Sequence, residues 1–522
     1  MKFDWNPFHK KKQETRSGNS QKELPISDDL SQNIKRLSDE FGDNSEIIIR
    51  ELNTGMKKDI RVVSIYMDGL VDQTLVNEFI LESLKLNHSD FDKNTPKKDV
   101  FNELRMNALT LSNVKVINDW DQLVLTILSG STLVMIDGWN EVLSGETQGW
   151  EERAIQEPTS QTVVRGPKDS FTESLKVNVT LIRKRIKNVN LRVETFQIGT
   201  VSRTNISIMY MKGIAKDDLI QEVKRRLEKI DTDSIIESGN LEEFIQDHTS
   251  TPFPQLVNSE RPDAAVGNLL DGRVVILVDG TPFVLIAPAT FFQFFQSPED
   301  YYQRADIATL LRLLRFFVFF LSLFAPSIYI ALTTYHQEML PFPLLINLAA
   351  QREGVPFPAF VEALIMEVTF EILREAGVRM PRAVGQAVSI VGAIVIGEAA
   401  VQAGIISPAM VIVVGITAIS SFAVPSFSIA IPARILRFLL MVSAATAGFY
   451  GMILLVIMMA AHMNSLRSFG VPYLEPLSPF NLAAQADTFV RLPPKVKQKF
   501  TFKRDNTVNT ANPLNKEGDS NG

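Results

Sequence analysis

Few residues in this sequence are of a type that does chemistry. Cysteine is absent and the five histidines are scattered, so thiolate chemistry is excluded and no HxxH or HExxH pair exists to hold a metal. Glycine-rich nucleotide loops and the GxSxG nucleophile motif are also missing. We therefore expect a protein that is not an enzyme and has no cofactor and no metal site.

One carboxylate, Glu398, lies in a long apolar stretch, because residues 383–433 contain no other charged residue. At 100° per residue, one face of a helix there carries this carboxylate among apolar and amide side chains. Its members are Val391, Ile394, Glu398 and Gln402. This face is predicted to line a pore, with Val391 and Ile394 as an apolar constriction and Glu398 favouring cations. The alternative is a structural Glu398, either protonated or paired with an arginine or with Gln402.

Small residues follow a second face of the same helix, roughly opposite the carboxylate. They are Gly385, Ser389, Ala393 and Gly397. Small side chains allow two helices to approach closely, so this stripe is predicted to be a helix-packing face.

A second acidic set lies upstream and comprises Glu362, Glu367 and Glu371. Glu367 and Glu371 share a helix face, whereas Glu362 lies about 140° away from Glu367. Two interpretations remain open at this point. The face either lines an ionic vestibule or forms the wet side of an amphipathic helix on the membrane surface.

A basic segment separates two halves of the N-terminal region. Its charged members are Arg165, Lys168, Arg183, Lys184 and Arg185. They are candidates for contact with lipid headgroups or with an acidic patch on a partner protein. An ordinary solvated helix face explains the same composition, and composition alone favours that interpretation.

Long apolar stretches must position the carboxylates. A membrane span needs about 20 residues, and four stretches meet this requirement. The expected spans are about 313–335, 383–403, 406–431 and 438–461. Residues 341–373 carry glutamates and prolines and are predicted to be polar or re-entrant. The arginines near the span ends place the N-terminal region on the cytoplasmic side, while the number of crossings stays open by one.

The N-terminal region alternates strand and helix patterns, and two of these patterns recur. Residues 65–75 resemble residues 209–219 at an offset of 144, and residues 130–138 resemble residues 272–280 at an offset of 142. We therefore predict an α/β region of two similar lobes followed by an α-helical transmembrane bundle, which makes a multi-pass membrane protein. The expected parts are a weakly ordered tail 1–44, lobe 1 over 45–160, the basic connector with lobe 2 over 161–300, a membrane domain 301–485 and a basic, disordered cytoplasmic tail 486–522.

The net charge of −6 argues against nucleic acid as a partner. Several long strings resemble the spore germinant receptor A subunits, the GerA family. These strings are 165–175, 181–186, 260–263, 278–283, 299–302, 353–358, 371–381 and 468–473. The strings occur in order, and the resemblance extends from about residue 45 to residue 485, so that only the two tails lie outside it.

The resemblance implies a membrane subunit of a nutrient receptor that initiates spore germination, located in the spore inner membrane with its N-terminal region on the spore core side. It implies a B subunit similar to an amino-acid permease, a C subunit that is a lipoprotein, and an oligomer of A subunits that forms a ligand-gated cation path among membrane lipids. The alternatives are a non-conducting scaffold or coupling subunit, a nutrient bound by the lobes themselves, and a solute transporter, which the absence of an inverted repeat disfavours.

Overall fold

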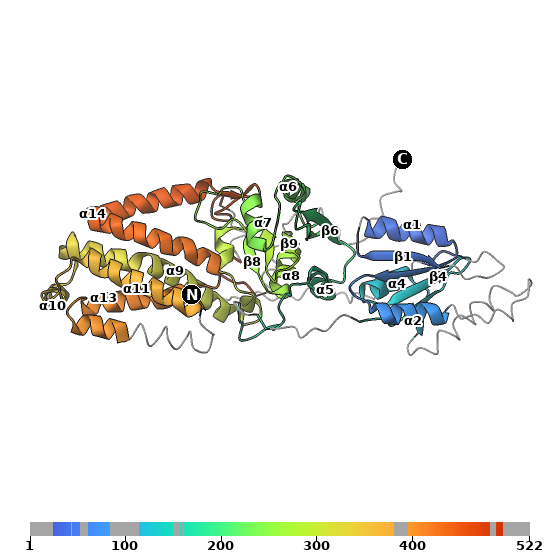
Figure 1. Ribbon diagram of the computed structural model, residues 1–522, viewed down its shortest axis with the longest axis horizontal. Coiled ribbons are helices and arrows are strands. Elements are labelled where there is room, and N and C mark those ends of the chain that lie inside the picture. Colours follow the sequence, from blue (N-terminus) through green and yellow to red (C-terminus); the bar gives the residue numbers. More distant parts are fainter. Residues whose placement is uncertain are drawn as a thin grey trace, which may run out of the picture. The chain divides into compact units, whose positions relative to one another are not determined.

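The computed structural model describes residues 25–42, 44–52, 61–83, 114–149, 157–158, 161–379, 395–480 and 487–493. The chain divides into two compact units (Figure 1). One unit comprises Met1–Glu151 with Lys187–Val189, and the other comprises Glu152–Ile186 with Asn190–Gly522. Lobe 1 corresponds to the first unit, whereas lobe 2 and the helical part belong to the second.

Lobe 1 is a five-stranded antiparallel sheet with helices on both faces. Its elements are α1 Leu30–Phe41, β1 Ile47–Leu52, β2 Val62–Met67, α2 Gln73–Ser83, β3 Val114–Ile117, α4 Trp120–Leu128, β4 Thr132–Ile136 and β5 Val142–Gly145. The strand order is β1-β2-β4-β5-β3. Helices α1 and α4 share one hydrophobic core with β2 and β4, while α2 packs on the opposite face of β2.

The ordered part of lobe 1 begins earlier than predicted. Asp29 caps α1 by accepting hydrogen bonds from the backbone amides of Ser31 and Gln32. Leu37 and Phe41 of this helix are 1% and 2% exposed. The prediction of a weakly ordered tail over residues 1–44 is therefore wrong for about its last third, which forms α1. Polar residues dilute the average hydropathy of this segment, whereas the helical spacing gathers its few apolar residues on one buried face.

Lobe 2 repeats this topology. Its elements are α5 Leu175–Arg185, β6 Leu191–Ile198, β7 Thr204–Met211, α6 Asp217–Glu228, α7 Ser238–Ile245, β8 Val257–Ser259, α8 Pro262–Leu270, β9 Val274–Val278 and β10 Val284–Ala287. Its antiparallel sheet has the order β6-β7-β9-β10-β8, which is the order of the first sheet. The predicted duplication of an α/β lobe is confirmed.

Strand register agrees with the repeat residue by residue. Val62 of β2 pairs with Ile136 of β4, and Ile206 of β7 pairs with Val278 of β9. These pairs are related by the same offsets of 144 and 142 that relate the sequence strings. The central ladder of each lobe is therefore built from equivalent residues.

The helical part follows two short 3₁₀ helices, η1 Phe291–Phe295 and η2 Pro298–Tyr301. Its elements are α9 Ala305–Thr334, η3 Gln337–Met339, α10 Phe342–Arg352, α11 Ala359–Arg379, a helical stretch 395–402, α13 Pro408–Phe422 and α14 Phe427–Ser465, then β11 Arg467–Ser468 and β12 Val471–Pro472. Helix α9 packs against α11, α13 and α14 (Figure 1). Their buried apolar residues form one cluster.

Helix α14 reverses direction in its middle. Ala447 and Gly448 have non-helical backbone angles, and Gly448 has φ +57°. A Cβ placed on Gly451 would lie 2.8 Å from the carbonyl oxygen of Ser443, although residues eight apart in a straight helix are separated by about 12 Å. The two arms of α14 therefore run back alongside one another (Figure 1). The predicted span 438–461 is wrong, because apolar residues continue through the turn and hide it from a hydropathy profile.

The other predicted spans have mixed outcomes. The stretch 313–335 lies almost wholly within α9, whereas the stretch 406–431 is broken at residues 423–426 between α13 and α14. The first part of the stretch 383–403 lies outside the described residues, and residues 395–402 are helical. Within the described part of the chain, α9 and α14 are long and apolar enough to cross a membrane by length and composition, where the length of α14 is counted across its turn at Ala447 and Gly448.

Candidate functional site

The acidic residues of α11 point into the helical part, where arginines and backbone amides meet them. Glu367 and Arg437 of α14 form an ion pair with Oε2 and Nη1 2.6 Å apart, and their side chains are 0% and 1% exposed. A buried carboxylate is costly without such a partner. This pair therefore joins α11 to the first arm of α14.

Glu371 forms a second contact between the same two helices. Arg434 of α14 donates to it from Nε and Nη2, and Arg374 lies 3.5 Å from it on α11. The guanidinium of Arg374 also lies over the rings of Phe370 and Phe422. Two arginines thus share one partly buried carboxylate.

Glu362 is wholly buried near the start of α11. Its Oε2 accepts a hydrogen bond of 3.0 Å from the backbone amide of Ser407, and its Oε1 accepts one of 3.2 Å from Arg352 Nε. The carboxylate of Glu362 therefore accepts a hydrogen bond from the backbone at the N-terminal end of α13. Glu362 and Glu367 thus form neither an open acidic vestibule nor a wet surface in this chain, and both interpretations left open for them are wrong.

Several atoms of this network lack a hydrogen-bond partner among the described residues. They are Glu367 Oε1, Arg374 Nε, and Nε and Nη2 of Arg437. Each such buried polar atom costs about 1–3 kcal/mol. The ion pairs that join α11 to α14 therefore leave some buried polar atoms unpaired, which lowers the stability of the folded chain. Water or a new polar group near these atoms would change their energy.

Glu398 has a different setting from the α11 glutamates. It is exposed on the helical stretch 395–402, where Gln402 donates a 3.2 Å hydrogen bond to its Oε1. Val391 and Ile394 of the predicted pore face lie outside the described residues, so only half of that face is visible. The visible half presents a carboxylate and an amide on the surface of the chain.

The predicted packing stripe is visible at one position. Gly397 is buried, and a Cβ there would lie 3.2 Å from Val411 of α13. Gly385, Ser389 and Ala393 lie outside the described residues. Gly397 therefore faces a neighbouring helix on the side away from exposed Glu398.

The basic segment is divided between surface and core. Arg165 is exposed, and Lys168 forms an exposed pair with Glu157 at 3.1 Å. Arg183 is 1% exposed and donates to the carbonyl of Leu191, so its inclusion in a contact surface is wrong. The two remaining basic residues, Lys184 and Arg185, are partly buried, and Arg185 pairs with Asp169.

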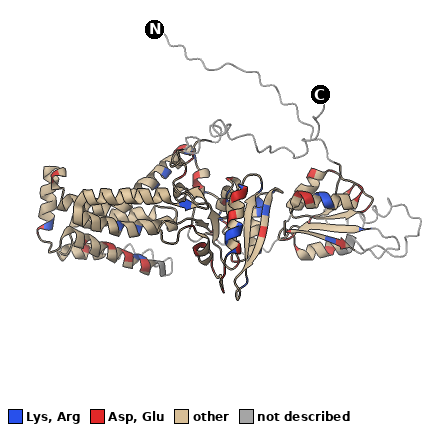
Figure 2. Ribbon diagram, turned by 90° about the horizontal axis from the view of Figure 1, so that it is seen from above, with Lys and Arg blue, Asp and Glu red and all other residues tan. Residues whose placement is uncertain are grey.

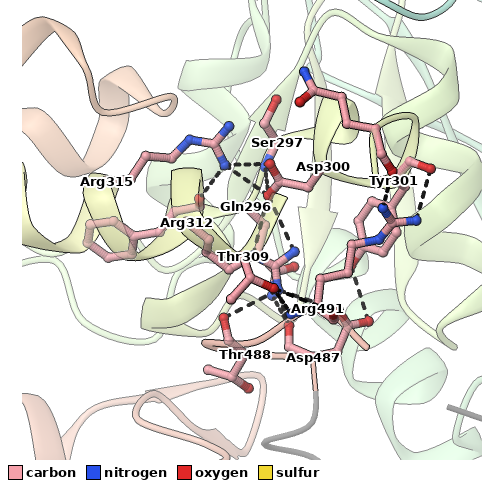
Figure 3. A network of polar contacts seen from close by, with 12 residues as sticks. Gln296, Ser297, Asp300, Tyr301, Thr309, Arg312, Arg315, Asp487, Thr488 and Arg491 are labelled. Atoms are coloured by element: carbon pink, nitrogen blue, oxygen red, sulfur yellow. Dashed lines mark hydrogen bonds and ion pairs between the residues drawn. The ribbon is translucent and has the colours of Figure 1, made fainter. Parts of the chain in front are cut away.

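A buried polar network lies where lobe 2 meets the start of α9 (Figure 3). At its centre, Asp300 of η2 is wholly buried and receives Arg315 Nη1 at 2.7 and 2.8 Å and Arg312 at 3.3 Å. Arg312 is itself 0% exposed. A single carboxylate thus neutralises two arginines on successive turns of α9.

The segment 487–493 completes this network from the far end of the chain (Figure 3). Arg312 Nη1 donates to the carbonyls of Asp487 and Thr488, and Arg491 donates to the carbonyls of Gln303 and Tyr301. The ring of Phe489 packs edge-on against Phe292 and at a tilt against Phe316, with 5.1 Å between ring centroids in each case. Part of the tail predicted as disordered over 486–522 is therefore packed against α9. We call residues 487–493 the C-terminal strap.

These arrangements consist of ion pairs and hydrogen bonds that join one element to another. Among the described residues, no cluster of three histidine, aspartate or glutamate side chains could hold a metal ion. Charged residues are few along the middle of the long helices, as Figure 2 shows. The polar groups instead gather at joints between elements: α11 with α14, and η2 with α9 and the strap.

Sequence reasoning missed the strap network and the partners of the α11 glutamates. A signal was present, because Arg312, Arg315, Arg434 and Arg437 lie in or beside apolar helices and each needs a counter-charge. From the sequence alone, these arginines orient the chain in the membrane, and Arg434 is a candidate partner of Glu398 rather than of Glu371. Asp300 lies within one of the family-like strings, where nothing in the local pattern identifies its partners.

Comparison with known proteins finds a matching family and several similar chains. Residues 35–501 match the family described as Bacillus/Clostridium GerA spore germination protein. Spore germination protein KA of Bacillus subtilis (strain 168) is 53% identical over 475 residues, which cover 91% of this chain and 86% of that protein. Spore germination protein GerLA of Bacillus cereus is 36% identical over 93% of this chain and 98% of its own length.

Among solved structures, the N-terminal domain of the A subunit of the Bacillus megaterium spore germinant receptor GerK3 is 36% identical, with a TM-score of 0.41. The match covers 52% of this chain and 98% of that domain. The family match extends over both lobes and the helical part. The chain therefore belongs to the GerA family of spore germination proteins.

Proposed function

We propose that this chain is the A-type subunit of a spore germinant receptor, with its helical part in the spore inner membrane. Relatives named as spore germination proteins at 53% and 36% identity support this role. Large apolar side chains on the outer faces of the helices support the location. Phe317, Ile419 and Ile457 are 63%, 73% and 59% exposed, and a surface of this kind is covered by lipid or by another protein.

The orientation with both lobes on the spore core side follows from the basic residues near α9. Arg304 is exposed and supports this placement, although it pairs with Asp306. Arg312 and Arg315 carry less weight, since Asp300 neutralises them. A permease-like B subunit and a lipoprotein C subunit complete the proposed complex, and exposed Arg165 and Lys168 are candidates for contact with a partner or with lipid.

We further propose that several copies of the chain form a cation path, and the observation that carries this proposal is the exposure of Glu398. A carboxylate on a membrane helix is expensive in contact with lipid, so it faces water or another protein chain. Gln402 shares that face and holds the carboxylate by a hydrogen bond. Val391 and Ile394, which the sequence pattern predicts on that face, would supply an apolar constriction.

Ion flux through liposomes that contain the purified protein with its B and C partners tests this path. Glu398→Gln should lower nutrient-triggered potassium release severalfold, and Ile394→Ala should permit release without nutrient. Glu338→Gln is a matched control, because Glu338 is an exposed glutamate in the same helical part. Release equal to that of the parent protein in both test variants would remove this face from the path.

A second candidate is a subunit that couples signals without conducting ions. The pairing of Glu362, Glu367 and Glu371 of α11 with arginines inside the chain favours it, since these three carboxylates are not free to line an open path. In that case the reconstituted complex would bind nutrient and show no flux in the parent protein. The same liposome measurement therefore separates the two candidates.

A further inference from the structure

A pocket of about 560 Å³ lies between lobe 2 and the segment that joins α13 to α14. Its walls include α8, β8, the two 3₁₀ helices and residues 422–426. This volume falls within the range of small-molecule sites. Neither the family match nor the polar networks described above assigns it a role.

One cation in this pocket has no paired carboxylate. Arg273 precedes β9, and its Nη1 donates a 2.6 Å hydrogen bond to Asn268 Oδ1. Among the described residues, no carboxylate lies within ion-pair distance of its guanidinium. Burial lowers the pKa of Arg273 from its ordinary value. Asp271 and Glu475 act on this charge at longer range, and an anion that entered the pocket would meet a partly buried guanidinium that has no ion-paired carboxylate.

Three amide contacts fix the orientation of the polar groups around this arginine. Asn268 Nδ2 donates to the carbonyl of Ala264 at 2.8 Å, which directs its Oδ1 toward Arg273 and Gln293. Gln293 Nε2 donates to the same oxygen at 2.9 Å, so the Oε1 atom of Gln293 points away from Asn268. Gln293 is 8% exposed, and its Oε1 has no hydrogen-bond partner among the described residues. A residue of the pocket wall, bonded to the same amide oxygen as Arg273, thus carries a buried acceptor atom without a partner.

The other charged residues of the pocket determine whether a ligand would place an ammonium group or a hydroxyl group next to Gln293. Arg261 holds the carboxylate of Asp263 at 2.7 and 3.1 Å, and Tyr302 donates to it at 2.6 Å. Asp271 also lines the pocket but is exposed to solvent. A buried ammonium group would therefore lack a free buried counter-charge, whereas a hydroxyl needs none.

We infer that this pocket binds a small 2-hydroxycarboxylate. Its carboxylate would pair with Arg273, its hydroxyl would donate to Gln293 Oε1, and its short carbon chain would lie against Phe294 and Val257. Phe422 and Val424 line the far wall. A bound molecule would therefore contact lobe 2 and the segment before α14 together. This inference does not depend on ion conduction or on the identity of the nutrient.

Binding to the purified full-length protein in detergent is the test, measured by isothermal titration calorimetry. The probes are L-lactate and L-malate, with L-lactamide as the neutral control and inorganic phosphate as a second anion. At least one hydroxycarboxylate should bind tenfold or more tightly than lactamide and phosphate. Arg273→Gln should weaken that binding at least tenfold, and Gln293→Leu should weaken it severalfold.

A blocking variant guards against loss of folding. Gly267 lies on α8 and lines the pocket, and a Cβ placed on it would meet no atom within 4 Å. Gly267→Leu should therefore fold and abolish binding, while Gly267→Ala should bind like the parent. Failure of both hydroxycarboxylates to bind the parent protein would overturn the inference, as would undiminished binding by Arg273→Gln or by Gly267→Leu. Tighter binding of phosphate would show a general anion site instead.

Discussion

Glu367 on α11 and Arg437 on α14 are 70 residues apart in the chain, yet their charged atoms lie 2.6 Å from one another in the helical core. Neither side chain has all of its polar atoms satisfied among the described residues. Such a pair adds little net stability, because removing two charges from water costs about as much as their attraction returns. Its effect is to specify how α11 sits against α14.

Removal of one partner should therefore be far more harmful than removal of both. Glu367→Leu leaves Arg437 buried without a counter-charge, and we expect it to lower the free energy of unfolding by about 3–5 kcal/mol. The double variant Glu367→Leu with Arg437→Leu should recover most of this loss. Denaturant unfolding of the purified protein in mixed micelles measures both, and a single variant that costs less than about 1 kcal/mol would contradict the assignment.

Asp300 holds two arginines of α9, so its loss should loosen the start of that helix. Asp300→Asn keeps the shape and removes the charge that neutralises Arg312 and Arg315, and a cost of about 3 kcal/mol is expected. Hydrogen–deuterium exchange should rise in residues 298–316 and in the C-terminal strap together. The strap is included because Arg312 also donates to the carbonyls of Asp487 and Thr488.

The same helix offers a matched control. Asp306 pairs with Arg304 at 2.8 Å, but the two side chains are 62% and 80% exposed. Asp306→Asn should change stability by less than about 0.5 kcal/mol and should leave exchange in the strap unaltered. Equal effects of Asp300→Asn and Asp306→Asn would show that burial of the Asp300 network does not increase its contribution to stability.

The sequence predicted the lobes well because their determinants occur twice in it. Alternating apolar residues and turn glycines recur at fixed offsets, and the equivalent pairs Val62–Ile136 and Ile206–Val278 follow from them. The helical part was harder. Hydropathy does not change at Gly448, where the chain reverses, and the partner of Arg312 comes from 175 residues further along the chain. Contacts at that separation leave no periodic pattern in a single sequence.

The turn glycines of the repeat lead to a graded prediction in lobe 2. Gly272 has φ +84°, and a Cβ there would lie 2.9 Å from the carbonyl oxygen of Ile214. Gly213 has φ +82° with no atom within 4 Å of such a Cβ. We expect Gly272→Ala to cost more than Gly213→Ala, which should cost about 1–2 kcal/mol for its backbone conformation alone.

Gly267→Ala supplies the opposite case. This glycine lies in α8, with open space around the position of a Cβ. Alanine there should be neutral or stabilising by about 0.5–1 kcal/mol. Urea unfolding of lobe 2 in the full-length protein, followed by pulse proteolysis, ranks the three variants. An order other than Gly272→Ala, then Gly213→Ala, then Gly267→Ala would refute the steric explanation.

Glu242 on α7 gives lobe 2 a dependence on pH near neutrality. Burial raises the pKa of its carboxyl from 4.5 to about 7, with smaller contributions from the charges of Glu237 and Glu243. The folded lobe therefore binds a proton more tightly than the unfolded chain does. Stability should fall as pH rises from about 4.5 to about 7, and the full loss should be present above that range.

Glu242→Gln should remove this dependence, because glutamine resembles the protonated form at every pH. At pH 8 the variant should be more stable than the parent by about 1–3 kcal/mol, and at pH 4 the two should be nearly equal. Pulse proteolysis across this pH range measures the difference. Glu228→Gln, an exposed position on α6, controls for the loss of one negative charge. A constant gap between parent and Glu242→Gln from pH 4 to pH 8 would show that Glu242 is ionised throughout.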